Sequence, residues 1–174
     1  MRIVLAAMTM AVLAGPAMAQ HHRQYQHAPT PYAAQQQRDI KAMSDQQIAD
    51  LRQGRGMGLA LAAELNGYPG PMHVLEFKDQ LHLTADQHQR FQKLFESMKA
   101  EAIEAGEGLI ASERALDRAF AEGRMTSDAL DTLTARIGEA QGRLRAVHLK
   151  YHLTSAELLS DHQRRRYADL RGYR

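Results

Sequence analysis

Two histidines spaced one helical turn apart are the strongest candidates for chemistry in this sequence. His148 and His152 open and close the stretch HLKYH. An i, i+4 pair places two imidazoles on one face of a helix, close enough to share a metal ion. Two histidines alone bind weakly, so a site needs further ligands. His73 and Glu76, spaced i, i+3 upstream, are the best candidate donors, and Met72 is a softer alternative.

Imidazole and carboxylate ligands suit a divalent transition metal, so zinc, nickel, cobalt and copper are all candidates. Calcium and magnesium prefer shells made only of oxygen. The alternative is that His148 and His152 are polar surface or interface residues that bind no ion. A separate group near the N-terminus, His21, His22 and His27, either holds a metal loosely or belongs to a solvated tail.

The elements that must position these side chains are two long helices between about Leu83 and Tyr173. Apolar and small residues recur every three or four positions from Phe91 to Phe120 and again from Leu130 to Tyr151. This spacing predicts one apolar seam along each helix. The only break is the short stretch 123–126, so we expect antiparallel neighbours that form a helical hairpin roughly 50 Å long.

The register of the second long helix puts the histidine pair beside this seam. If Tyr151 occupies an a position of the heptad and Val147 a d position, His148 is at e and His152 at b. That placement weakens an interpretation of both as core histidines. Solvent, one of the short helices or a dimer partner remain as what the pair faces.

Three short helices are expected before the long ones. Ser44 is an N-cap for the first, and Pro71 suits the first turn of the third. The expected ranges are 45–53, 59–65 and 72–81. Glycines 54, 56 and 58 separate the first two helices; without a preceding strand or a following Lys-Ser/Thr, this spacing does not indicate a phosphate loop.

The N-terminus has the features of an export signal. A positive start, an apolar run over residues 3–13 and the small residues Ala17 and Ala19 predict cleavage after Ala19. We therefore expect a signal peptide over 1–19, a disordered His- and Gln-rich leader over 20–43 and a helical domain over 44–174. The expected location is the bacterial periplasm, with retention of the signal as an anchor the alternative.

Composition narrows the class of function. There is no cysteine, which excludes disulfides and thiolate chemistry, and 22 basic residues nearly balance 20 acidic ones. Export and mixed charge both argue against nucleic acid as a partner. Carboxylate pairs such as Glu101 and Glu104 are typical of a solvated helix face, and no nucleophile elbow is present. We expect a binding protein that uses no nucleotide, and not an enzyme.

Two capping boxes flank the long helices. Leu83-Thr84-Ala85-Asp86-Gln87 and Leu159-Ser160-Asp161-His162-Gln163 each place a hydroxyl three residues before a glutamine. Behind a signal peptide, this arrangement resembles the LTxxQ-motif periplasmic stress family, which includes Spy/CpxP chaperones and ZraP/CnrX-like heavy-metal sensors. The segment 56–77 is also similar to the one that precedes the first motif in such sensors.

The resemblance implies an all-helical, cradle-like homodimer without catalysis. The first function expected is that of a metal-responsive envelope-stress or resistance protein. An ATP-independent holdase for unfolded clients and a regulatory binder of an envelope sensor are the alternatives. Any contact with a membrane would be transient, through basic residues of the C-terminal half such as Arg164, Arg165 and Arg166.

Overall fold

A computed structural model describes residues 30–173 of the 174-residue chain. The predictions made for the signal peptide, its cleavage after Ala19 and the histidines at 21, 22 and 27 lie outside this range. The chain divides into two compact units, Met1–Ala33 and Ala34–Arg174. Throughout the described residues the regular structure is helical, as expected.

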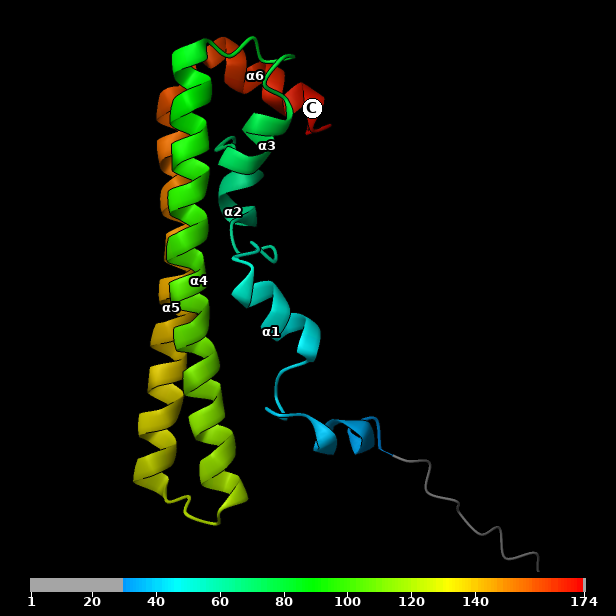
Figure 1. Cartoon of the computed structure of the whole chain (residues 1–174), viewed down its shortest axis with the longest axis vertical. Coiled ribbons are helices and arrows are strands. Elements are labelled where there is room, and N and C mark those ends of the chain that lie inside the picture. Colours follow the sequence, from blue (N-terminus) through cyan, green and yellow to red (C-terminus); the bar gives the residue numbers. More distant parts are fainter. Residues whose placement is uncertain (1–29, 174) are drawn as a thin grey trace, which may run out of the picture. The chain divides into compact units, whose positions relative to one another are not determined.

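A pair of long helices organises this unit. Helix α4 (Ala85–Ala121) and helix α5 (Ser127–Leu158) lie side by side and are joined by residues 122–126 (Figure 1). Thr84 and Thr126 cap their N-termini by accepting hydrogen bonds from the backbone N–H groups of Gln87 and Ala129. The expected all-helical class with a packed pair of long helices is confirmed.

The other helices are short. They are the 3₁₀ helix η1 (Ala33–Gln37), α1 (Asp45–Arg52), α2 (Leu61–Glu64), α3 (Pro71–Glu76) and α6 (Asp161–Leu170). Helix α1 nearly matches the expected range, whereas α2 and α3 are shorter than expected. Helix α3 ends at Glu76, after which Phe77 leaves helical geometry with φ of −100° and ψ of 19°; the chain then turns through residues 77–82 and reaches a left-handed φ of 49° at His82. Such a conformation cannot continue a helix.

Two hydrophobic clusters hold the short helices against the long pair. In the first, α1 packs through Ile48 and Leu51 on the middle of α4 and α5. In the second, Phe91 of α4 and Tyr167 of α6 enclose Val74 of α3. The cavity described below is lined by residues of α2, α3, α4 and α5 and of the segment between α1 and α2.

The first cluster corrects the boundary expected at residue 44. Ile40 is fully buried and Met43 nearly so, and both pack with α1 and the long helices. The packed unit therefore starts well before Ser44, and residues 34–43 are not part of a disordered leader. Their apolar side chains were too isolated in a polar stretch to produce a periodic pattern.

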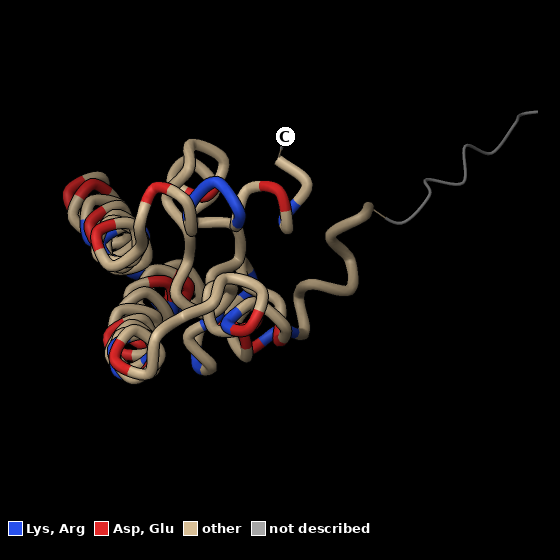
Figure 2. Tube along the Cα trace, turned by 90° about the horizontal axis from the view of Figure 1, so that it is seen from above, with Lys and Arg blue, Asp and Glu red and all other residues tan. Residues whose placement is uncertain are grey.

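The surface of the unit carries both signs of charge. Basic and acidic residues are interspersed along the helices (Figure 2). The expected seam does not stay buried to its end, because Phe120 and Leu130 beside the α4–α5 connection are 58% and 37% exposed. Within residues 30–173, no helix combines the length and apolar character needed to cross a bilayer.

Candidate metal site

His148 and His152 lie one turn apart on the face of α5 that the segment 54–70 covers. Only 2% of His148 and 8% of His152 remain exposed. Of the three surroundings considered from the sequence, the structure therefore places the chain's own N-terminal segment over the pair. Both rings are buried because a second layer, the segment 54–70, packs on this face of α5.

Glycines allow the covering segment to approach the two rings. A Cβ on Gly70 would lie 2.9 Å from Cε1 and 3.0 Å from Nε2 of His152, and one on Gly56 would lie 3.9 Å from the ring of His148. Gly54, with φ of +65°, is pressed against the Lys99 carbonyl of α4. The glycine-rich stretch thus serves close packing on α4 and α5, which agrees with rejecting a phosphate loop.

The hydrogen bonding of His152 defines its tautomer. Its Nδ1 lies 2.7 Å from the backbone carbonyl oxygen of Tyr68. A carbonyl oxygen only accepts, so Nδ1 carries the hydrogen and donates it. In the neutral ring this leaves a lone pair on Nε2. Histidine ligands of metals commonly have their other nitrogen oriented in this way.

His148 is buried without full satisfaction of its polar atoms. No group within residues 30–173 forms a hydrogen bond with its Nε2. The hydroxyl of Ser155, seven residues further along α5, also lacks a partner among these residues. Burial lowers the pKa of His148, and the nearby His152 lowers it further, so the ring is held neutral. An unpartnered buried nitrogen costs about 1–3 kcal/mol, so it calls for an explanation.

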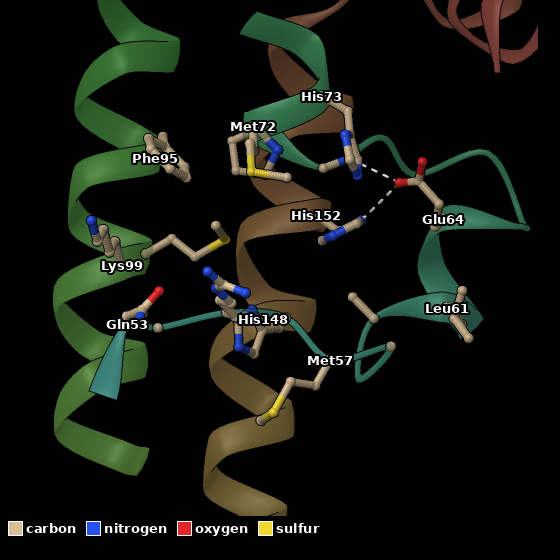
Figure 3. A pocket seen from close by; sticks show the side chains of 18 of the residues that line it. Gln53, Met57, Leu61, Glu64, Met72, His73, Phe95, Lys99, His148 and His152 are labelled. Carbon is tan, nitrogen blue, oxygen red and sulfur yellow. Dashed lines mark hydrogen bonds and ion pairs between the residues drawn. The ribbon is translucent and has the colours of Figure 1, made fainter. Parts of the chain in front are cut away.

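Both imidazoles line a cavity of about 590 Å³. His73 lines it as well, from α3, so the structure brings three predicted site residues together (Figure 3). Glu76 does not line it. Its carboxylate is half exposed and pairs with Nδ1 of His73 at 2.9 Å, outside the cavity. Met72, the softer alternative, contributes to the lining and is 42% exposed.

The carboxylate at the cavity is Glu64 of α2, which the sequence reasoning missed. Only 6% of Glu64 is exposed, and its Oε2 lies 3.7 Å from Nδ1 of His152 (Figure 3). A signal was available, since Glu64 is the one charged residue in the apolar stretch LALAAEL. A buried carboxylate needs partners, and that isolation pointed to a buried position.

Glu64 is already engaged by several donors. Its Oε1 accepts hydrogen bonds from the hydroxyls of Tyr167 and Tyr173 and lies 3.3 Å from Nε of Arg171. Its Oε2 accepts the backbone N–H of Gly70 at 3.1 Å. Burial and the carboxylate of Glu64 both raise the pKa of Tyr167, so its hydroxyl stays a donor. Glu64 therefore ties α2 to α6 and to the wall of the cavity.

The cavity offers imidazole nitrogens, but it does not bring together enough ionisable side chains to complete the coordination of a metal ion. In the part of the chain that the structure describes, no three His, Cys, Asp or Glu side chains are grouped closely enough to hold an ion. His148 and His152 are the nitrogen donors that the cavity offers as it stands. His73 becomes a third donor only if its ring moves away from Glu76, and any other ligand must come from other residue types.

Comparison with families of known proteins, with curated proteins and with solved structures found no match in any of the three.

Proposed function

We propose that this protein is an exported, metal-responsive stress or resistance protein of the LTxxQ group that binds a transition-metal ion through His148 and His152. The observation that carries the proposal is the state of these two rings. One has its Nδ1 hydrogen fixed by a backbone carbonyl, and the other is neutral, buried and lacks a partner for Nε2. Neutral imidazoles with available lone pairs are ligands for zinc, nickel, cobalt and copper.

Binding would stabilise the contact between α5 and the segment that covers it. Gly56 and Gly70 of this segment, and Met72 of α3, line the same cavity as the histidines. An ion held between α5 and α3 favours the state in which both sides of its site are assembled. The response to metal is then a tighter packing of the N-terminal segment on the long helices, without catalysis.

The test is a calorimetric titration of the purified protein with zinc, nickel, cobalt and copper, repeated on the double variant His148→Ala/His152→Ala. We expect stoichiometric binding that the double variant loses. A matched control is His82→Ala/His88→Ala, which also removes two histidines but outside the cavity. Circular dichroism must show that each variant keeps its helices.

Three other results are informative. Binding that survives in the double variant but disappears when His21, His22 and His27 are replaced would assign the metal to the N-terminal histidines. Equal loss in the two double variants would indicate a nonspecific effect of histidine number. No binding to any of the four metals, with copper supplied both as Cu(II) and as Cu(I), would reject the proposal.

A second candidate function is supported by apolar side chains on the surface. Leu61, Leu65 and Tyr68 are 55%, 61% and 41% exposed, close together in the chain around α2. In a cradle-like homodimer, such side chains between mixed charges would hold unfolded clients without ATP. This holdase predicts suppressed aggregation of a denatured client, with the suppression weakened in Leu61→Ser/Leu65→Ser. Light scattering of the protein alone checks for the dimer, and no suppression at stoichiometric excess would exclude the holdase.

A further inference from the structure

The cavity with the two histidines also contains thioethers. Met57 from the glycine-rich segment, Met72 from α3 and Met98 from α4 all line it. Met98 is 7% exposed, whereas Met57 and Met72 are 44% and 42% exposed. Figure 3 shows Met57 and Met72 on the same side of α5 as His148 and His152. Methionines from three separate elements thus line the same cavity as the two imidazoles.

The charges around this cavity disfavour a doubly charged ion. Arg55, Lys99 and Arg171 line it, and its carboxylate is Glu64. Glu64 already pairs with Arg171 and accepts hydrogen bonds from Tyr167 and Tyr173. No carboxylate in the lining is therefore left to neutralise an added ion. A divalent ion would bring twice the uncompensated charge of a monovalent one into this partly buried space.

The neutral donors present also select by softness. Thioethers are soft ligands that suit Cu(I), whereas nickel, cobalt and zinc at imidazole sites are usually completed by carboxylates, thiolates or water. Here two imidazoles and up to three thioethers are available, and the chain has no cysteine. Ag(I) has the same charge and similar softness, and it does not change oxidation state in solution.

Resting on the proposed function, we infer that the ion bound at this site is soft and monovalent, Cu(I) or Ag(I), held by His148, His152 and methionine thioethers of the cavity. The segment 54–70 supplies Met57, α3 supplies Met72 and α4 supplies Met98. Binding therefore joins three elements that only the tertiary structure brings together.

The experiment compares Ag(I) with zinc and nickel on the same purified protein. We expect Ag(I) to bind more tightly than either divalent ion. The triple variant Met57→Leu/Met72→Leu/Met98→Leu keeps the apolar volume but removes the sulfurs, and we expect its Ag(I) affinity to fall by more than about tenfold. Met125→Leu, in the α4–α5 connection and outside the cavity, is the matched control and should bind Ag(I) as the parent does.

A second readout guards against misfolding of the triple variant. X-ray absorption at the copper edge, with the protein loaded with Cu(I) under reducing conditions, should show sulfur scatterers. These should diminish in Met72→Leu or Met98→Leu, single changes that conserve side-chain volume closely. A Cu(I) spectrum with nitrogen scatterers alone in the parent would overturn the inference.

The outcomes separate this inference from the proposed function. Zinc or nickel bound tightly through His148 and His152, with weaker Ag(I), would overturn the soft-ion inference and leave the metal-binding function standing. Unchanged Ag(I) affinity in the triple variant would do the same. Failure of Ag(I), zinc, nickel, cobalt and copper alike to bind would reject both.

Discussion

The side-chain amides of Gln87 and Gln163 donate to each other across the packed unit. Nε2 of Gln87 lies 3.0 Å from Oε1 of Gln163, and Nε2 of Gln163 lies 3.1 Å from Oε1 of Gln87. Each amide also donates to a backbone carbonyl, that of Leu158 or Leu81. The two capping boxes, far apart in sequence, are therefore one structural unit that fastens the start of α6 to the start of α4.

This pairing predicts that Gln87→Glu destabilises the protein more than capping alone would explain. A glutamate at this position still accepts from the Thr84 N–H and keeps the box, but it cannot donate to Leu158 or Gln163. We expect a loss of about 1–3 kcal/mol in the free energy of unfolding, measured by urea denaturation at neutral pH.

The matched control is Gln47→Glu in the third capping box, which Ser44 and Gln47 form at the start of α1. Among the described residues the hydrogen bonds of the Gln47 side chain stay within this box, so the change should be close to neutral. Equal effects at the two positions would mean that the contact between the boxes contributes nothing to stability.

Two glycines of α4 should respond to alanine in opposite directions. A Cβ on Gly106 would lie 3.0 Å from the backbone oxygen and 3.2 Å from Cβ of Leu51, so α1 would have to move. A Cβ on Gly108 would meet no neighbour. We expect Gly106→Ala to cost about 1–3 kcal/mol through overpacking. Gly108→Ala should stabilise by about 0.5–1 kcal/mol because glycine is a poor helix former.

Thermal denaturation of the two variants tests this contrast. Because both changes improve the helix propensity of α4 equally, the difference between them reports the close packing of α1 on α4. Stabilisation by Gly106→Ala of the same size as by Gly108→Ala would show that α1 does not approach α4 so closely.

The two tyrosine hydroxyls that donate to Glu64 should contribute unequally to the free energy of unfolding. Tyr167 is 2% exposed and Tyr173 is 37% exposed, yet both donate to Oε1 of Glu64. Tyr167→Phe removes a hydrogen bond from a buried carboxylate and should cost about 1–3 kcal/mol in unfolding free energy. Tyr173→Phe should cost less because water can replace its hydroxyl. Denaturant titrations of the two variants measure the difference, and a larger cost at Tyr173 would contradict this account.

The buried state of His148 predicts a loss of stability in mild acid. Burial lowers the pKa of His148 in the folded protein, so between its folded pKa and the unfolded value near 6.5 the unfolded chain binds more protons. Stability from this residue is therefore complete above pH of about 6.5 and decreases as the pH falls towards the folded pKa. The metal affinity of the folded protein should fall only at still lower pH, below the folded pKa of His148, because a protonated imidazole cannot bind the ion.

Urea denaturation of the metal-free protein at a series of pH values from 8 to 5 tests the stability effect. His148→Gln, which cannot titrate, should show a smaller decrease over this range than the parent. Parallel curves for the two proteins would mean that His148 is not buried in its neutral form.

The sequence by itself determined the local features of this protein. The starts of α1, α4 and α6 were readable because a hydroxyl and a glutamine three residues later satisfy backbone groups within one turn. The pairing of α4 with α5 followed from apolar periodicity and a short connection. The i, i+4 spacing of His148 and His152 likewise ensured a common face.

Only the tertiary structure decided what lies against that face. Three features depend on segments that are distant from α5 in the sequence. They are the close approach of glycines 54, 56 and 70 to the long helices, the position of the Glu64 carboxylate, and the burial of Ile40. Glu76 pairs with His73 but is not part of the cavity lining, whereas Glu64, without any motif, lies 3.7 Å from Nδ1 of His152. Hydrogen bonds within one turn are set by neighbouring residues, but contacts between distant segments depend on how all the helices pack together.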